Sequence, residues 1–326
     1  MGKIAWSQYR LGHYREALDS YEEAIQQGET AQLLYWKARS LEKNKKNKTG
    51  EKPQEVYQNI IQMYPATYYA VRAAERLNRL GIGTDYKSWW TPVGLQWSEE
   101  EKEFSASSYL DKIYTLTSLD LIADAEVEIR LARQNNDDSQ WEGLPLPNDP
   151  RRFVKKSDAY RFHFRIPTQD TEYRLPYADF LFSEIKRHQN FIDPFLVYAI
   201  MRQESRYRPS IVSPVGAIGL LQIMPYTGRK LSKEAGWSVF TPSWLRDPLT
   251  NIELSVFYLK KLDNLFAGKW YATVASYNAG EFAVSQWLKQ RHGLSEEEFI
   301  EEIPYGETRD YVKKIYTNWK AYQTIY

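Results

Sequence analysis

The sequence predicts a mainly α-helical protein, with helical repeats at the start and a second helical region after them. Two observations support this prediction. Apolar residues recur at helical spacing along most of the chain, and clusters of Gly, Pro and polar residues interrupt that spacing at intervals. A chain of 326 residues can also bury more than one core. We therefore expect three regions: repeats over 1–82, a helical linker region over 83–171, and a second domain over 172–326.

The first region carries a repeat pattern. Gly12, Tyr14, Ala17, Tyr21 and Ala24 have the spacing of the second helix of a tetratricopeptide repeat. The small residues permit close helix contact, and the tyrosines fill the space between helices. Stacked repeats need neighbours to cover their apolar faces. Because the chain opens in the middle of such a repeat, we expect the array to be truncated at the N-terminus.

Further helices are expected along the first two regions. The spacing predicts helices over 31–41 and 54–63 around a solvated loop at 42–52, and another helix from Pro65 to Leu77. Beyond a connector at 84–97, we expect a helix over 104–135, a loop over 140–150 and a helix over 153–164.

The composition excludes several classes of function. The net charge is +1, which argues against non-specific nucleic-acid binding. The chain has no cysteine, and its four histidines lack metal-ligand spacing, so we do not expect a zinc hydrolase. No apolar stretch approaches the roughly 18 residues that a membrane-spanning helix needs. No secretion signal precedes the first helical pattern.

Glu204 is the first candidate for chemistry. Asp193 and Pro194 predict the N-cap and first residue of a helix that ends near Ser205. In this helix, Glu204 ends an apolar face that includes Val197. A carboxyl group in such a setting loses hydration, which favours its protonated form. A general acid that protonates a glycosidic oxygen needs this property, although most glutamates near helix ends are simply solvated.

The segment 215–224 is the second candidate. Gly216 and Gly219 allow unusual backbone angles. If the segment is extended, Gln222 lies on the same side as Met224, as in a wall that contacts a sugar. A buried hairpin whose Gln satisfies backbone groups is the alternative, and the residues alone do not decide between them.

Two later segments are also candidates. Gly280 is expected to break the chain between two helices, which places Tyr277 at a turn where its hydroxyl can reach a carboxylate. A packed tyrosine at a helix junction is the simpler alternative. The acidic run from Glu296 to Glu302 is expected to be the solvated face of a helix. Glu307 lies outside this run, beyond Pro304.

Four sequence blocks occur in a fixed order: IMRQES at 200–205, SPVGAIGLLQIMP at 213–225, ASYNAG at 275–280 and IPYGETRDYV at 303–312. Together they resemble the catalytic domain of the soluble lytic transglycosylases, bacterial enzymes that cleave the glycan strands of peptidoglycan. The resemblance covers residues 172–326. It implies a lysozyme-like α+β domain of the goose type with a small β-sheet, preceded by a helical superhelix.

The resemblance also implies roles for particular residues. Glu204 is expected to act as the catalytic acid, with Tyr277 hydrogen-bonding or positioning it. Ser205 is equally well explained as a hydrogen-bonding residue at the helix end. Glu307 would bind substrate or support Tyr277. The residues expected to bind substrate are Ser205, Ser213, Gln222, Met224, Asn278 and Glu307.

The reaction that the resemblance implies needs one carboxyl group and no metal or organic cofactor. Glu204 would protonate the leaving oxygen between N-acetylmuramic acid and N-acetylglucosamine, then remove a proton from the muramic 6-hydroxyl to give a 1,6-anhydro end. Ordinary glycosidases use two carboxyl groups, so a hydrolytic muramidase is the alternative. A scaffold that binds glycan and recruits proteins through its repeats is a further one. The implied partners are glycan strands and other cell-wall proteins, in the periplasm or cell envelope.

Overall fold

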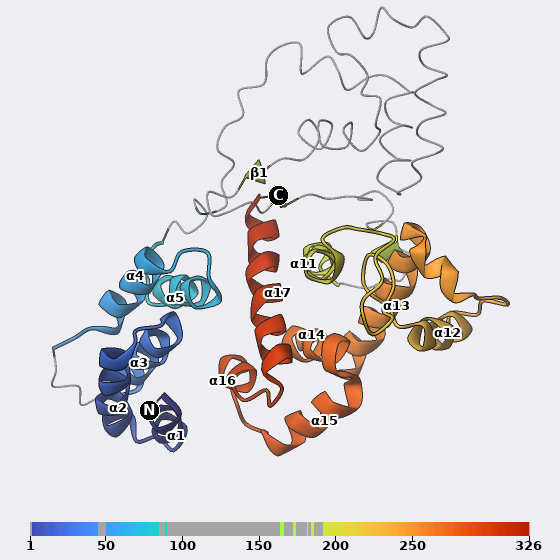
Figure 1. The fold of residues 1–326 in the computed structure, drawn as a ribbon. Helices are drawn as coiled ribbons and strands as arrows, with labels where there is room; N and C mark the ends of the chain where they lie inside the picture. Colours follow the sequence, from blue (N-terminus) through green and yellow to red (C-terminus); the bar gives the residue numbers. More distant parts are fainter. Residues whose placement is uncertain are drawn as a thin grey trace, which may run out of the picture. The chain divides into compact units, whose positions relative to one another are not determined.

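The computed structural model describes residues 2–44, 50–84, 89, 164–165, 172–173, 181, 184–185 and 192–325. These residues are mainly α-helical, as the sequence predicts (Figure 1). They form two compact units, with α1–α5 in the first and β1, β2 and α11–α17 in the second. The expected helix over 104–135 and the loop over 140–150 lie outside the described residues, as does nearly all of the connector at 84–97.

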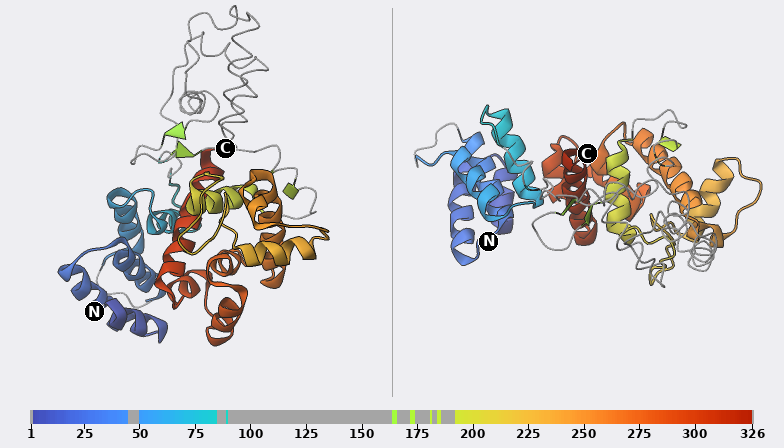
Figure 2. Two further views of the ribbon diagram at one scale, coloured as in Figure 1. Left: turned by 45° about the vertical axis from the view of Figure 1, so that its right-hand side comes forward. Right: turned by 90° about the horizontal axis from the view of Figure 1, so that it is seen from above.

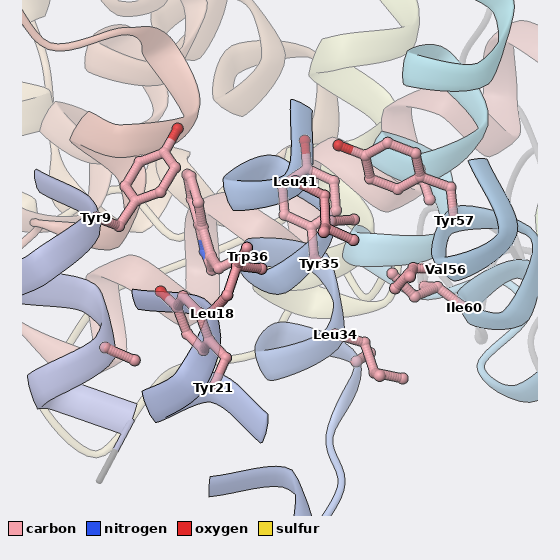
Figure 3. Packing of buried hydrophobic residues seen from close by; sticks show 14 of the residues in the cluster. Tyr9, Leu18, Tyr21, Leu34, Tyr35, Trp36, Leu41, Val56, Tyr57 and Ile60 are labelled. Carbon is pink, nitrogen blue, oxygen red and sulfur yellow. The ribbon is translucent and has the colours of Figure 1, made fainter. Parts of the chain in front are cut away.

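Helices that follow one another in the sequence pack together in the first unit. Their bounds are α1 Gly2–Arg10, α2 Tyr14–Gln27, α3 Ala31–Lys43, α4 Pro53–Met63 and α5 Tyr68–Arg79. The core between them is rich in aromatic rings: Tyr35 packs near Trp36 and Tyr57, and all three side chains are buried (Figure 3). Ala17 and Tyr21 of the repeat pattern are buried in the same core. That these helices are tetratricopeptide repeats stays a prediction.

The start of α5 differs from the prediction. The helix begins at Tyr68 rather than at Pro65, because Ala66 has a positive φ of 58° that no helix accommodates. Thr67 then caps the helix by accepting a hydrogen bond from the backbone N–H of Ala70. Thr67 was recognisable in the sequence as a possible cap, but Pro65, two residues before it, suggested an earlier start of the helix.

The second unit holds a small antiparallel sheet and a group of helices (Figure 2). The strands are β1 Phe164–Arg165 and β2 Glu172–Tyr173. The helices are α11 Pro194–Ser205, α12 Pro225–Glu234, the 3₁₀ helix η4 Pro242–Arg246, α13 Pro248–Leu265, α14 Trp270–Ala279, α15 Glu281–Gln290, α16 Glu296–Glu301 and α17 Gly306–Ile325. Phe164 belongs to a strand, so the expected helix over 153–164 does not include it. The rest of that range is outside the described residues.

Helix α11 begins where the sequence predicts. The Asp193 carboxylate accepts a hydrogen bond from the backbone N–H of Phe195 at 2.8 Å. The same carboxylate accepts hydrogen bonds from Trp319 Nε1 at 2.8 Å and Gln323 Nε2 at 2.6 Å, both on α17. The ring of Tyr322, also on α17, stacks on Phe195. The C-terminal part of α17 is therefore fixed to the first turn of α11.

The segment 215–224 is a tight hairpin rather than an extended strand with alternating sides. Ile218 and Ile223 exchange two backbone hydrogen bonds of 3.0 Å each, and the residues between them form the turn. Gly219 and Gln222 have positive φ values of 85° and 49°. The expected alternation fails because residues 219–222 form the turn, and the consecutive Leu220 and Leu221 are both buried.

Asn251 of α13 fastens this hairpin to the core. Its side chain accepts a hydrogen bond from the Leu221 N–H at 2.8 Å and donates to the carbonyls of Ile218 and Leu245 at 2.9 Å each. The side chain is fully buried, so each of these bonds replaces one that water would otherwise make.

The acidic run at 296–302 is not simply a solvated face. Glu297 and Glu301 are buried, and Glu301 pairs with Lys313 of α17 at 2.9 Å. Glu298 instead completes a capping box with Ser295 at the start of α16. The prediction was wrong for Glu297 and Glu301. For Glu301 the reason is that the charge pattern of one helix does not reveal a partly buried lysine on another.

Gly219→Ala should destabilise the protein by about 3 kcal/mol, since overpacking and positive φ both oppose a side chain there. A Cβ at this position would lie 2.2 Å from the Leu245 carbonyl oxygen and 2.3 Å from Asn251 Nδ2. Gly216→Ala is the matched control, because φ is +90° there but nothing lies within 4 Å of the added Cβ. It should cost only about 1–2 kcal/mol. Urea unfolding of both variants measures the difference, and equal losses would contradict the steric argument.

Candidate active site

Glu204 lies in the last turn of α11, at the end of its buried face. Val197, Ile200 and Met201 on this helix are fully buried. Burial raises the pKa of Glu204 from an ordinary 4.5 to about 7, against a lowering by a hydrogen bond from Tyr311 and with a smaller rise from the charge of Glu307. The carboxyl group therefore changes protonation near neutral pH, as a group that both gives and takes a proton requires.

Tyr311 of α17 makes the direct contact with this carboxyl group. Its hydroxyl donates a 2.6 Å hydrogen bond to Glu204 Oε1. Tyr311 is itself buried, and burial followed by the charge of Glu204 raises its pKa well above the usual value. The phenol thus stays protonated and acts as a permanent donor to the carboxylate.

The hydroxyl of Tyr277 does not donate its hydrogen bond to Glu204. It gives a 2.7 Å hydrogen bond to the Leu221 carbonyl, and Ser255 Oγ lies 3.5 Å away. The hydrogen bond to Glu204 that we expected from Tyr277 comes instead from Tyr311. Tyr277 still lies close enough for the charge of Glu204 to help raise its pKa, after the larger effect of burial. It lies in the last turn of α14 rather than at a turn, and Gly280, with φ of 85°, provides the predicted break.

Asn278 and Glu307 lie on facing helices. Asn278 Oδ1 accepts a 2.6 Å hydrogen bond from the hydroxyl of Thr308, the residue after Glu307. Glu307 is exposed in the first turn of α17, and its charge reaches Glu204. Charge interactions link Glu204 with Tyr277 and Glu307, and a hydrogen bond links Asn278 to the residue after Glu307, so these side chains come from three helices.

The two serines have structural contacts. Ser205 is buried, its Oγ donating to the Met201 carbonyl at 3.3 Å and accepting from the Arg208 N–H at 3.2 Å. These bonds correspond to the alternative of a hydrogen-bonding residue at the helix end. Ser213 is half-buried, and its Oγ accepts from the Ala217 N–H at 2.9 Å. It holds the loop that leads into the hairpin.

Gln222 also satisfies backbone groups. Its Nε2 donates to the carbonyls of Gly219 at 2.8 Å and Ile211 at 3.2 Å. The amide nitrogen therefore satisfies backbone groups, as in the alternative of a buried hairpin. Met224 follows at the N-cap of α12 and is exposed to 40%, so its side chain remains accessible for contact with a ligand.

Sequence reasoning missed two tyrosines. Tyr311 stands in the last sequence block, one helical turn after Glu307, and that spacing was the available signal. Tyr258 of α13 packs against Tyr277 with ring centroids 5.6 Å apart and donates a hydrogen bond to Glu281 at 3.1 Å. No local pattern distinguished it from a core tyrosine.

The described residues offer neither a cluster of metal ligands nor a helix that could span a membrane. No group of three or more His, Cys, Asp or Glu side chains there has an arrangement that could hold a metal ion. Among the helices of the described ranges, none has the length and apolar character needed to cross a membrane.

Known proteins resemble the second unit in sequence. Residues 182–300 match the family described as Transglycosylase SLT domain. The chain is 42% identical over 121 residues to the soluble lytic murein transglycosylase of Escherichia coli strain K12, covering 36% of this chain and 18% of that protein. It is 30% identical over 153 residues to the membrane-bound lytic murein transglycosylase C of Cronobacter sakazakii, covering 40% of this chain and 42% of that protein. The chain thus spans less than half the length of either relative.

Solved structures share the fold. The 70 kDa soluble lytic transglycosylase of Escherichia coli superposes with a TM-score of 0.68 at 23% identity, covering 99% of this chain and 51% of that one. Its complex with bulgecin A gives a TM-score of 0.65 at 24% identity, covering 99% and 51% of the two chains. The fold is therefore the mainly helical one predicted from the sequence. The sequence match over residues 182–300 confirms the predicted resemblance to the soluble lytic transglycosylases.

Proposed function

We propose that this protein is a peptidoglycan lytic transglycosylase that cleaves the β-1,4 bond between N-acetylmuramic acid and N-acetylglucosamine without water. The observation that carries the proposal is the state of Glu204: a largely buried carboxyl group with a pKa of about 7 and one phenol donor. The relatives named as lytic murein transglycosylases support the choice of substrate.

In the first step, the protonated carboxyl of Glu204 gives its proton to the glycosidic oxygen. A pKa near 7 keeps a large fraction of the group protonated at neutral pH, which an ordinary glutamate would not. The bond from the anomeric carbon to this oxygen then breaks. The acetamido group of the muramic acid residue stabilises the positive charge that develops at the anomeric carbon, which removes the need for a carboxylate nucleophile.

In the second step, the Glu204 carboxylate takes the proton from the muramic 6-hydroxyl. The hydroxyl oxygen bonds to the anomeric carbon and closes the 1,6-anhydro ring. Tyr311 supports both steps, because its hydrogen bond to Glu204 Oε1 stabilises the carboxylate that exists between them. Tyr277 has an indirect part: it holds the Leu221 carbonyl and so keeps the hairpin beside α14.

The remaining expected site residues are proposed to contact the glycan. Met224 and Glu307 have exposed side chains, while Asn278 presents a side-chain amide beside Tyr277. Ser213 and Gln222 are half-buried and hold backbone groups, so they shape the surface of the hairpin as well as lining it. Ser205 is proposed to support α11 from behind, since it is buried.

The region assignments are part of the proposal. Repeats over 1–82 and the linker over 83–171 would serve the catalytic domain over 172–326, either by enclosing the glycan or by binding other cell-wall proteins. A protein that acts on peptidoglycan belongs in the periplasm or cell envelope. The reaction as proposed uses only side chains and substrate groups.

Hydrolysis by a muramidase is the second candidate, and one observation favours it. Glu307 is a second carboxylate within electrostatic reach of Glu204, and paired carboxyl groups are typical of hydrolytic glycosidases. In that mechanism Glu307 would activate a water molecule. The product distinguishes the two: an anhydro end is lighter than a hydrolysed end by one water. A glycan-binding scaffold would form neither product.

Digestion of purified peptidoglycan should give 1,6-anhydromuramic ends by mass spectrometry, and Glu204→Gln should lower turnover by about 10³-fold or more. The amide cannot transfer a proton as the acid does, but it keeps the shape of the side chain. Glu234→Gln is the matched control, because Glu234 lies on α12 in an exposed ion pair with Lys261. Reducing, hydrated ends would replace our proposal with the muramidase, and cleavage by Glu204→Gln at the wild-type rate would refute the assignment of the acid.

The pH dependence of kcat/KM should move in opposite directions in two variants. The first step needs protonated Glu204, so activity should fall as the pH rises through about 7. Tyr311→Phe removes a donor that stabilises the carboxylate, which should raise the pKa of Glu204 and move this fall to higher pH. Glu307→Gln removes a nearby negative charge and should move it to lower pH. Shifts of the same sign in both variants would contradict the assigned electrostatics.

Glu204 should also make stability depend on pH. Its pKa in the folded protein lies above the ordinary 4.5, so its stabilising contribution is complete below about pH 4.5 and is lost as the pH rises through about 7. Glu204→Gln does not titrate. Between pH 5 and 8 we therefore expect the free energy of unfolding of this variant to rise relative to that of the wild type, by about 3 kcal/mol at most. Thermal unfolding across this range measures the gain, and parallel curves would show that Glu204 is not perturbed.

A further inference from the structure

A hydrogen bond connects two of the sequence blocks at the site. The Thr308 hydroxyl donates to Asn278 Oδ1 at 2.6 Å, linking the first turn of α17 to the last turn of α14. Thr308 is only 2% exposed, so its hydroxyl cannot turn to water instead. The bond joins the residue after Glu307 to the residue after Tyr277.

This bond fixes which end of the Asn278 amide faces outward. A hydroxyl has one proton to donate, and Thr308 gives it to the amide oxygen. The oxygen therefore points to α17, and Nδ2 with its two protons points away from it. Across the part of the chain that the structure describes, Nδ2 has no hydrogen-bond acceptor, and Asn278 is an exposed residue.

The hydrogen bond between Thr308 and Asn278 joins segments that carry the neighbours of Glu204. Asn278 follows Tyr277, which is near enough to Glu204 to feel its charge. Thr308 lies one turn before Tyr311, which hydrogen-bonds Glu204. An exposed, oriented donor with no acceptor among the described residues, on the segment that follows Tyr277, is suited to bind an acceptor oxygen of the substrate.

We propose that Asn278 Nδ2 donates to an uncharged acceptor oxygen of the glycan strand, a carbonyl or hydroxyl, and that Thr308 is the positioning residue that fixes this polarity. The inference rests on the proposed function for its ligand. Without the Thr308 hydroxyl, the amide could rotate by half a turn and present its oxygen, which repels another acceptor.

The experiment measures binding and turnover separately. Binding of a tetrasaccharide of alternating N-acetylglucosamine and N-acetylmuramic acid is measured by calorimetry in the full chain carrying Glu204→Gln. Into this background go Thr308→Val, Thr308→Ser, Asn278→Ala and the double variant Thr308→Val with Asn278→Ala. Thr317→Val is the matched control: it lies on the same helix, and its hydroxyl donates only to the Lys313 carbonyl of that helix. With Glu204 intact, KM and kcat are measured on glycan strands.

Thr308→Val should weaken tetrasaccharide binding by about 3- to 10-fold, the effect of one neutral hydrogen bond. Thr308→Ser should restore most of the affinity, because it returns the hydroxyl. Thr317→Val should bind like the parent. In the active enzyme, KM should rise for Thr308→Val while the pH profile of kcat stays in place. The double variant should bind no more weakly than Asn278→Ala, because Thr308 acts only through the amide.

Additive losses in the double variant, or an equal loss in Thr317→Val, would refute the positioning role. Should Thr308→Val fail to fold, Asn278→Asp decides: it keeps an oxygen for Thr308 to donate to but has no donor, so it must lose affinity. Unchanged affinity in Asn278→Asp would overturn the proposal. If Glu204→Gln binds no tetrasaccharide and the wild type cleaves no strands, the proposed function itself fails, which is a separate result.

Discussion

The site depends on the pairing of α11 with α17. At one end, the Asp193 carboxylate caps α11 and accepts hydrogen bonds from Trp319 and Gln323. At the other end, the Glu204 carboxyl group accepts a hydrogen bond from the hydroxyl of Tyr311. Because the two helices are held at both ends, the distance between the carboxyl group and its donor is set by backbone geometry rather than by flexible side chains. Lys313, paired with Glu301 of α16, further fixes the rotation of α17.

A second constraint shapes the facing wall. Asn251 hydrogen-bonds to the backbone of Ile218 and Leu221 in the hairpin, and the Leu221 carbonyl accepts a hydrogen bond from the hydroxyl of Tyr277. A buried amide with every hydrogen bond satisfied specifies one arrangement, since any shift would leave polar groups without partners. Gly219 is required at the point of closest approach. The hairpin and α14 are therefore held in one relative position, which also fixes the backbone at Asn278 and Met224.

Local signals predicted much of the fold, and contacts distant in sequence supplied the rest. Asp193 with Pro194 predicted the start of α11, and Gly280 predicted the break after α14, because capping and positive φ are properties of a few neighbouring residues. The partner of Glu204 could not be predicted in this way. Tyr277 and Tyr311 both stood in suitable blocks, and only packing across 107 residues shows which hydroxyl reaches the carboxylate. The burial of Glu301 likewise depends on Lys313.

The different hydrogen bonds of the two tyrosines suit the proposed mechanism, in which one carboxyl group serves as acid and then as base. Each hydrogen bond to a carboxylate favours the ionised form and lowers its pKa. Glu204 has one such bond within the described residues, from Tyr311, and burial outweighs it to leave the pKa at about 7. A second bond from Tyr277 would lower that pKa further and leave less of the group protonated at neutral pH. Tyr277 donates to the Leu221 carbonyl instead. Glu204 therefore keeps the proton affinity that the proposed first step needs, and the bond from Tyr311 stabilises the anion that the proposed second step needs.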